Sequence, residues 1–247
     1  MNEITNFSCR FCDSQLDTIF LDLGVTPSAN SFLKKENLSS EKSFPLRVFV
    51  CNKCLLVQLP ETIDPNELFS DYAYFSSFSE TWLKHAKDYV DMMISRFDIK
   101  HSSKIMEIAS NDGYLLKNFV NRDIPVLGIE PASNIADTAI KNEIPTLKKF
   151  FSVKTANEIK EKNGLADLLI GNNVLAHVPN INDFISGMKI LLSSNGIITM
   201  EFPHILQLIK NNEFDTIYHE HFSYFSFITV QKIFNSHNLE IFDVEEI

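Results

Sequence analysis

IMEIASNDGYLLKNFVNRDIPVLGIEP, residues 105–131, is the stretch of this chain that decides its fold. It begins with the apolar run Ile105 to Ile108, passes through a polar loop and a segment that we expect to be helical, and ends with a second apolar run, Val126 to Ile129. Strand, loop, helix and strand in this order form the first βαβ unit of a doubly wound nucleotide-binding fold. Glu130 lies 23 residues after Glu107, close to the spacing of about 20 residues at which an acidic side chain accepts the hydroxyls of a ribose.

The glycine pattern of the loop indicates which nucleotide would bind. A dinucleotide site brings backbone close to a pyrophosphate and therefore needs glycine at alternating loop positions. Here these positions hold Ala109, Asn111 and Gly113, so that side chains would block the approach of a pyrophosphate. We expect S-adenosylmethionine instead, because it carries no phosphate and its amino-acid end needs polar partners. Another nucleotide, or a plain βαβ turn without a ligand, is the alternative.

The remaining pattern alternates between strands and helices, which predicts an α/β fold with a doubly wound, mostly parallel sheet. A helix is expected from Glu80 to Phe97, with apolar side chains at helical spacing. Further helices are expected near 133–142, 152–162, 182–192 and 229–237, and strands near 145–148, 166–171, 196–202 and 239–245. Ligands of such sheets bind beyond the carboxyl ends of the strands, which directs attention to 109–113, 130–131, 172–179 and 203–226. The last connection is long enough to be functional.

All four cysteines fall into two pairs of the same spacing, Cys9/Cys12 and Cys51/Cys54. In a reducing compartment this spacing favours one tetrahedral zinc ion over disulfides, and four thiolates leave no position for water, so the zinc would be structural. Cysteines that merely fill a small core are the alternative. We expect residues 1–62 to form a zinc-binding domain, 63–100 a linking tract and helix that contribute to the substrate pocket, and 101–247 the nucleotide-binding domain.

Composition restricts the class of protein. With 45% hydrophobic and 22% charged residues the chain is ordinary for a globular protein. Its formal net charge of −10 argues against non-specific binding of nucleic acid, which needs clustered Lys and Arg. The sequence contains neither the run of about 20 apolar residues of a membrane span nor a signal-peptide pattern at its start. We therefore expect a cytoplasmic protein that binds neither nucleic acid nor a membrane.

Histidines mark two of the segments that follow strands. Tyr218-His-Glu-His221 lies in the long connection, among further aromatic residues, and His177 follows directly after a strand. The two histidines of the first group lack the i, i+4 spacing of a helical zinc pair, whereas acid–base chemistry needs only one histidine oriented by one carboxylate. A solvated polar loop, and for His177 a capping or packing role, are the alternatives.

Taken together, these motifs resemble those of a known family, the zinc-containing, S-adenosylmethionine-dependent C-methyltransferases that act on nucleotide-linked deoxy-ketosugars, of the sugar 3-C-methyltransferase type. The resemblance covers nearly the whole chain. Its motifs occur in the family's order: Cys9/Cys12, Leu21-Asp-Leu-Gly24, Cys51/Cys54 with Val57-Gln58-Leu59, Tyr72-x-Tyr-x-Ser-Ser77, Glu107-x-x-x-Asn-Asp-Gly113, Gly128-x-Glu-Pro131, His177-x-Pro179 and Tyr218-x-Glu-His221.

The resemblance implies an enzyme that adds a methyl group to the carbon α to the ketone of such a sugar, with dTDP as the expected nucleotide. It assigns structural zinc to Cys9, Cys12, Cys51 and Cys54. It assigns the methyl donor to Glu107, Ala109, Ser110, Asn111, Asp112, Gly113, Glu130, Pro131 and Asn172. The acid–base and oxyanion groups would be Tyr72, His177, Tyr218, Glu220 and His221, with an imidazole as base, Glu220 orienting it or sharing the proton, and a tyrosine hydroxyl donating to the enolate oxygen.

The sequence departs from the family at two places. Ala109 and Lys149 stand where glycine and an acidic residue are common, and the family's seventh strand and C-terminal domain, which covers the nucleotide-sugar, do not follow residue 247. We therefore expect a fragment, a partner chain that supplies the missing half, or a substrate that is bound in a different way. A small-molecule O- or N-methyltransferase and an inactive zinc-binding and S-adenosylmethionine-binding module are the competing functions.

Overall fold

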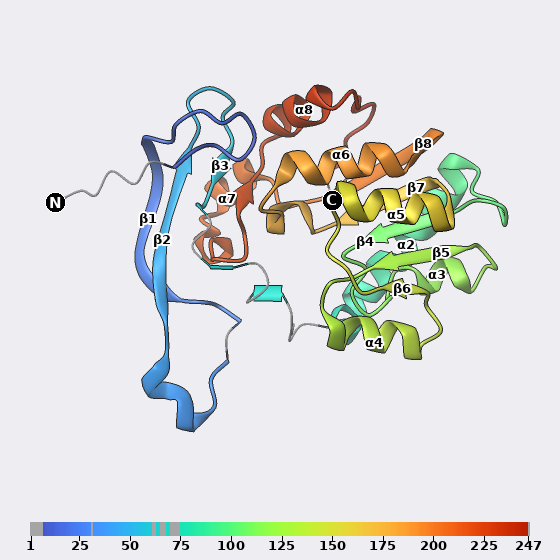
Figure 1. Ribbon diagram of the computed structural model, residues 1–247, viewed down its shortest axis with the longest axis horizontal. Coiled ribbons are helices and arrows are strands. Elements are labelled where there is room, and N and C mark those ends of the chain that lie inside the picture. The colour runs from blue at the N-terminus through green and yellow to red at the C-terminus, as the bar shows by residue number, and fades with distance from the viewer. Residues whose placement is uncertain (1–6, 31, 61–62, 65–67, 70–74, 247) are drawn as a thin grey trace. The chain divides into compact units, whose positions relative to one another are not determined.

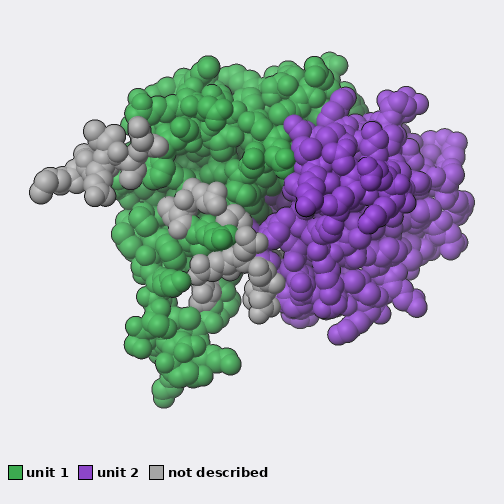
Figure 2. Space-filling view, viewed as in Figure 1, with its two compact units in different colours: residues 1–65, 175–185, 202–247 green, residues 66–174, 186–201 purple. Residues whose placement is uncertain are grey.

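A computed structural model of the chain describes residues 7–30, 32–60, 63–64, 68–69 and 75–246 (Figure 1). The contacts within it divide the chain into two compact units, which Figure 2 distinguishes by colour. Unit 1 comprises residues 1–65, 175–185 and 202–247, and unit 2 comprises residues 66–174 and 186–201. The domain boundaries predicted near residues 62 and 100 stay predictions. The segments that carry His177 and His221 belong to unit 1, which also contains the four cysteines.

Unit 2 is built on a five-stranded sheet of order β6-β5-β4-β7-β8 in which every described pairing is parallel. Its strands are β4 (Ile105–Ile108), β5 (Val126–Ile129), β6 (Thr146–Leu147), β7 (Ala166–Asn172) and β8 (Leu192–Glu201). All four residues of β4 are buried, as expected for a central strand that is covered on both faces. The strand order reverses direction between β4 and β7, which is the switch point where ligands of such sheets bind. The predicted fold class is confirmed.

The helices of unit 2 are η2 (Ser76–Phe78), α2 (Glu80–Phe97), α3 (Lys117–Val120), α4 (Ser133–Lys141), α5 (Val153–Asn163) and most of α6 (Ile181–Leu191). One apolar cluster joins α2 and α3 to a single face of the sheet. In this cluster Tyr89 and Met93 of α2 and Phe119 of α3 pack with Ile105 and Ile170. Because β-strand side chains alternate, the same face of β4 carries Glu107.

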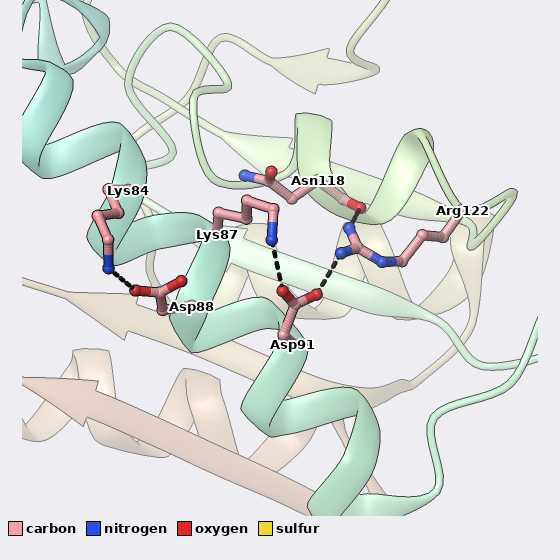
Figure 3. A network of polar contacts seen from close by, with 6 residues as sticks. All are labelled: Lys84, Lys87, Asp88, Asp91, Asn118 and Arg122. Carbon is pink, nitrogen blue, oxygen red and sulfur yellow. Dashed lines mark hydrogen bonds and ion pairs between the residues drawn. The ribbon is translucent and has the colours of Figure 1, made fainter.

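Helix α2 has clear sequence causes. The Ser79 hydroxyl caps its first turn by accepting a hydrogen bond from the backbone N–H of Trp82 at 3.2 Å, and its buried residues recur at helical spacing. On the solvent side Asp91 accepts from Lys87 at 2.8 Å and also from Arg122, which follows α3, while Lys84 pairs with Asp88 (Figure 3). Each of these exposed ion pairs stabilises the helix by only a few tenths of a kcal/mol. Most of the stabilisation of α2 therefore comes from its buried residues, among them Tyr89, Val90 and Met93.

Unit 1 contains a four-stranded antiparallel sheet of order β1-β2-β3-β9. Its elements are β1 (Thr18–Pro27), η1 (Lys35–Ser40), β2 (Ser43–Val50), β3 (Val57–Gln58), η3 (Leu175–His177), α7 (Ile205–Asn211), η4 (Phe214–Thr216), β9 (Ser223–Tyr224) and α8 (Phe227–Ser236). Strand β3 begins three residues after Cys54, and β9 begins two residues after His221. The pairing of Val57 with Tyr224 therefore ties the second cysteine pair to the segment that carries His221.

Most predicted elements are found close to their expected positions, with two differences. The helix expected after the 109–113 loop is reduced to the single turn of α3, since residues 111–116 form bends and turns. The strand expected at 239–245 is wrong. Its apolar residues are present, but none of the described strands pairs with it, and Phe242 and Val244 are exposed. An apolar pattern supplies no hydrogen-bonding partner, and a strand needs one. Among the helices of the described residues, none is both long enough and apolar enough to cross a bilayer.

Candidate active site and zinc centre

The four cysteines lie together in unit 1. Their sulfur atoms are all within 4.8 Å of one another, with Cys9 Sγ 3.5 Å from Cys54 Sγ and Cys12 Sγ 3.6 Å from Cys51 Sγ. A tetrahedral zinc ion at about 2.3 Å from each thiolate requires sulfur separations of about 3.8 Å. The donor set and its spacing therefore fit one zinc ion with no open coordination position. The predicted zinc ligands are brought together as expected, and all four thiols are free of disulfides.

Each cysteine pair forms the same tight turn. The backbone N–H of Asp13 donates to Cys9 O, and that of Leu55 donates to Cys51 O, both at 2.9 Å. Both turn residues have positive φ angles, 57° and 70°, which lets the chain turn back after the second cysteine of each pair. Gln58 Nε2 donates to Cys9 Sγ at 3.1 Å, so an amide of β3 supports the first thiolate. The hydrogen bond between the two thiols lowers the pKa of Cys9 and raises that of Cys54, so without a metal ion one proton is shared by this pair and zinc would have to displace it.

The loop after β4, residues 109–113, adopts the conformation of a glycine-rich loop although it contains one glycine. Ala109, Asn111 and Gly113 have φ angles of 56°, 49° and 80°. A Cβ atom at position 113 would lie 2.8 Å from Ile144 Cγ1, so both conformation and space require glycine there. The left-handed conformation costs about 1–2 kcal/mol at a non-glycine residue such as Ala109, which indicates that the surrounding contacts impose it.

The backbone amides of this loop are used within the protein. The N–H of Ala109 donates to Ile129 O at 2.8 Å, that of Asn111 to Glu130 Oε2 at 3.0 Å, and that of Gly113 to Ser110 O at 3.1 Å. The N–H of Asp112 donates to the Asn111 side chain at 2.9 Å. A phosphate-binding loop instead aims its amides at the ligand. The geometry therefore supports the expectation that this loop does not hold a pyrophosphate.

Polar side chains at this edge of unit 2 keep acceptor atoms without a partner among the described residues. These atoms are Glu107 Oε2, Ser110 Oγ, Asp112 Oδ1 and Asn172 Oδ1, and all are buried. Buried polar groups are normally hydrogen-bonded, so four such atoms from predicted donor-site residues indicate a place for a polar ligand. Burial above all, with the neighbouring Glu130 and Asp112, raises the pKa of Glu107 well above its ordinary value. A ligand with positive charge would relieve this repulsion.

Glu130 is held by two backbone groups. Its Oε2 accepts from Asn111 N, and its Oε1 accepts from Ala132 N at 2.9 Å. Burial raises its pKa to about 7 despite these two hydrogen bonds. Each carboxylate oxygen has a second lone pair, so both can still accept a ribose hydroxyl. Pro131 follows Glu130 at the end of β5.

The tract before α2 contacts the same loop. The N–H of Ser76 donates to Asn111 Oδ1 at 2.9 Å, and that of Ser77 donates to Asp112 Oδ2 at 3.3 Å. This part of the aromatic tract thus belongs with the loop of unit 2. Tyr72, which was predicted to contribute a hydroxyl, lies outside the described residues.

The histidine cluster of unit 1 consists of His177, Tyr218 and His221. Their rings are close, with the His177 centroid 4.7 Å and the Tyr218 centroid 4.2 Å from that of His221. His221 Nδ1 lies 2.8 Å from Thr216 O, and His177 Nδ1 lies 3.0 Å from Glu220 O. A carbonyl can only accept, so in both neutral rings Nδ1 carries the proton and Nε2 keeps its lone pair. Tyr218 OH, 3.0 Å from His221 Nε2, then donates to it.

The electrostatics of the cluster keep it neutral. Burial lowers the pKa of both His177 and His221 below the ordinary histidine value, and proximity to His221 lowers that of His177 further. Burial, with Glu220 nearby, raises the pKa of Tyr218 to about 12. At neutral pH the cluster therefore presents a proton acceptor and a hydroxyl donor side by side.

Glu220 is predicted to orient the imidazole base or to share the proton, and that role stays a prediction. The ring of His221 is held by the Thr216 carbonyl, and the ring of His177 by the backbone carbonyl of Glu220. The Glu220 carboxylate accepts from Asn30 Nδ2 at 2.6 Å. The reasoning from sequence missed Asn30, Thr216 and Ser76, since two of them act through backbone atoms and Asn30 lies in a turn far away along the chain. His219 does not belong to this cluster, since its Nε2 lies 3.3 Å from Phe44 O. Among the described residues, the four cysteines are the one group that could hold a metal ion.

Comparisons with known proteins identify two parts of the chain. Residues 9–69 match a family described as a zinc binding domain, and residues 82–244 match a family described as a methyltransferase domain. The chain is 36% identical over 239 residues to the C-methyltransferase NovU of Streptomyces niveus, which covers 96% of this chain. It spans only 56% of the length of that relative.

Solved structures show the same fold. A SAM-dependent methyltransferase from Archaeoglobus fulgidus superposes with a TM-score of 0.50 over 61% of this chain and 68% of its own, at 14% identity. The mycolic acid cyclopropane synthase CmaA1, solved with SAH, gives a TM-score of 0.53 over 74% of this chain and 72% of its own, at 13% identity. At such identities the likeness concerns the fold alone.

Proposed function

This chain belongs to the S-adenosylmethionine-dependent methyltransferase family, with a zinc-binding domain at its N-terminal end, and from that premise we propose that it transfers a methyl group to carbon. The proposed acceptor is the carbon α to the ketone of a nucleotide-linked deoxy-ketosugar, with dTDP as the nucleotide to test first. The observation that carries this proposal is the neutral imidazole of His221, with its Nε2 lone pair in contact with the Tyr218 hydroxyl. Methylation of carbon requires that the weakly acidic α proton is removed and that the resulting oxyanion is stabilised, and a neutral imidazole beside a hydroxyl donor offers both groups.

In the proposed mechanism, His221 Nε2 takes the proton from the α carbon and the electron pair moves onto the ketone oxygen. The Tyr218 hydroxyl, released from Nε2 when the sugar binds, donates to that oxygen. S-adenosylmethionine, when bound, supplies an electrophilic methyl group on its sulfonium. The enolate carbon forms the new bond to this methyl group as the bond from methyl to sulfur breaks. His177, with its own Nδ1–H fixed by Glu220 O, packs against His221 and stands as the alternative base.

We assign the methyl donor to the buried polar groups of unit 2. Glu130 would accept from the ribose hydroxyls, and Glu107 and Asp112 would face the positively charged amino-acid end. Ser110, Asn172 and the loop residues Ala109, Asn111 and Gly113, with Pro131, would complete the site. Support comes from the atoms of Glu107, Ser110, Asp112 and Asn172 that have no hydrogen-bond partner among the described residues. The mutual repulsion of the carboxylates, which a cation offsets, supports it as well.

Donor affinity should depend on pH through Glu130. Because its pKa is raised to about 7, the carboxyl is partly protonated near neutrality, and the ribose hydroxyls need the ionised form. We expect the affinity for S-adenosylmethionine to rise between pH 6 and pH 8. In Glu130→Gln this dependence should flatten and affinity should fall by about 1–3 kcal/mol, while Glu130→Ala should lose at least as much. Calorimetric titration at several pH values measures both. Tighter binding of NAD than of S-adenosylmethionine would contradict the donor assignment.

The same shift should appear in stability. The folded chain without donor binds the Glu130 proton more tightly than the unfolded chain does, so this contribution is fully present below the unfolded value of about 4.5 and is lost as pH rises through about 7. Donor binding should reverse this trend, because it favours the ionised carboxylate. Thermal unfolding with and without S-adenosylmethionine at pH 6 and pH 8 tests the sign.

The position of the new methyl group decides between the competing functions. The chain would be incubated with a dTDP-linked 4-keto-deoxysugar and S-adenosylmethionine labelled with ¹³C at the methyl group, and the product examined by carbon–proton correlation spectroscopy. A methyl group on the α carbon is the expected result. A methyl group on oxygen or nitrogen would favour a small-molecule O- or N-methyltransferase. If S-adenosylmethionine binds but no keto-sugar is methylated, even after a polypeptide that supplies the remaining part of the relative is added, an inactive module is favoured.

We also propose that a further polypeptide segment takes part. It would correspond to the part of the relative that this chain does not span, and it would bind the nucleotide end of the substrate. Supplying that segment as a separate chain should lower the KM for the nucleotide-sugar and leave S-adenosylmethionine affinity unchanged. An unchanged KM would contradict this role.

A further inference from the structure

Arg10 connects the first cysteine pair to both histidine segments of unit 1. It lies between Cys9 and Cys12, and its guanidinium donates from Nη1 to Pro179 O at 2.7 Å and from Nη2 to Leu59 O. The same group lies 5.3 Å from the centre of the Phe222 ring. Pro179 follows His177 by two residues and Phe222 follows His221 directly. One side chain of the cysteine turn therefore contacts the neighbours of both imidazoles.

Further contacts bind the same turn to these segments. The N–H of Arg10 donates to Gln58 Oε1 at 2.9 Å, and the amide of the same glutamine donates to Cys9 Sγ. Asn182 Nδ2 donates to Phe11 O at 2.9 Å, so the start of α6 also holds the turn. Gln58 belongs to β3, which pairs with β9 immediately after the histidine segment.

The two histidine segments are joined behind the rings. The N–H of Phe222 donates to Ala176 O at 2.7 Å, and the N–H of Leu59 donates to Phe222 O at 3.0 Å. These two hydrogen bonds connect the residue before His177, through the residue after His221, to Leu59, which directly follows β3. Arg10 contacts Leu59 O at one end and, near the other end, Pro179 O, three residues after Ala176.

We propose that Arg10 is a positioning residue: from the turn that carries two zinc ligands, its guanidinium holds the segments of His177 and His221 so that both imidazoles keep their positions. The catalytic importance of this role rests on the proposed function, whereas the test below does not require methyl transfer. A guanidinium is planar and presents several N–H groups in fixed directions, so it can hold two carbonyls and lie against an aromatic ring at once. A lysine ammonium at this position keeps the charge but lacks that fixed geometry. The zinc ion would thus act on the acid–base groups through the chain and not as a ligand of substrate.

The test compares Arg10→Gln, Arg10→Lys and a matched control, Arg47→Gln. Arg47 is an exposed arginine of β2 in the same unit, paired with Asp22 at 2.6 Å and outside the proposed machinery. Each protein would be labelled with ¹⁵N at histidine, its zinc content measured, and its imidazole signals recorded by proton–nitrogen correlation. His85 and His101 belong to unit 2 and serve as internal references.

The expected result is that Arg10→Gln keeps one zinc ion per chain while the signals of His177 and His221 shift or broaden and those of His85 and His101 do not. Arg10→Lys should show the same change to a smaller degree, and Arg47→Gln should match the unmodified chain. If methyl transfer can be measured, kcat should fall about 10–100-fold with unchanged affinity for S-adenosylmethionine.

Two results would overturn the proposal. In the first, a zinc-loaded Arg10 variant keeps His177 and His221 at their original signals. In the second, both Arg10 variants lose zinc while Arg47→Gln retains it, which would make Arg10 a residue of metal retention. Neither result depends on what the chain methylates, so failure of this inference and failure of the proposed function can be told apart.

Discussion

Replacing His221 with asparagine should slow removal of the α proton and methyl transfer together, by about 10²–10⁴-fold, the range credited to a positioned general base. Asparagine can still donate to the Thr216 carbonyl but offers no basic nitrogen where Nε2 lay. Incubation of the keto-sugar nucleotide with the chain in heavy water, without methyl donor, measures exchange of the α proton by itself. Because burial lowers the pKa of His221, exchange by the unmodified chain should stay nearly constant down to pH values below the ordinary histidine range.

Two companion variants make this result interpretable. His101→Asn, at an exposed histidine of unit 2, should leave exchange unchanged. Tyr218→Phe should slow exchange by about 10²–10³-fold if its hydroxyl stabilises the enolate oxygen. Unaltered exchange in His221→Asn would show that His221 is not the base, and His177 or Tyr72 would become the better candidate.

The parts of the site that depend on local sequence could be predicted. The cysteine spacing is sufficient to identify the zinc centre, because each pair forms its own tight turn and one ion needs four thiolates. The loop at 109–113 and Glu130 could likewise be placed at the carboxyl edge of the sheet, because successive parallel strands end at one edge. The positive φ angles of Ala109 and Asn111 could not, since neither residue type requires them and tertiary contacts impose them.

The parts that depend on long-range packing could not be predicted. The family resemblance assigned His177 and His221 to one site, but the pattern of residues did not predict that their rings lie 4.7 Å apart in direct contact. It also assigned the orientation of the base to a carboxylate, because the carbonyl of Thr216 is not visible in a pattern of side chains. The strand expected at 239–245 is wrong for a related reason, since its apolar side chains do not reveal whether a neighbouring strand is available.

Removing zinc should destabilise unit 1 far more than unit 2. Binding of a structural zinc ion to four thiolates is worth about 10 kcal/mol or more when folding and binding are coupled, which exceeds the stability of many small domains. The turn that contains Cys51 and Cys54 connects β2 to β3, and β3 pairs with β9, which follows His221. After chelation, hydrogen exchange should therefore accelerate in β2, β3 and β9.

The parallel sheet of unit 2 provides the contrast. Its apolar cluster contains residues of α2, α3, β4 and β7 and none of the cysteine ligands, so protection of β4 and β7 should persist in the zinc-free chain. Affinity for S-adenosylmethionine should persist as well, because every proposed donor residue lies in unit 2.

Cys12→Ser should reproduce the effect of chelation, whereas Ser14→Ala, which removes only the hydroxyl that Cys12 Sγ contacts at 3.4 Å, should retain zinc. A zinc-free chain with unchanged thermal stability would contradict a structural role for the metal. Equal loss of protection in both sheets would instead mean that the chain unfolds as one cooperative unit, and that the zinc stabilises the donor-binding sheet as strongly as the histidine cluster.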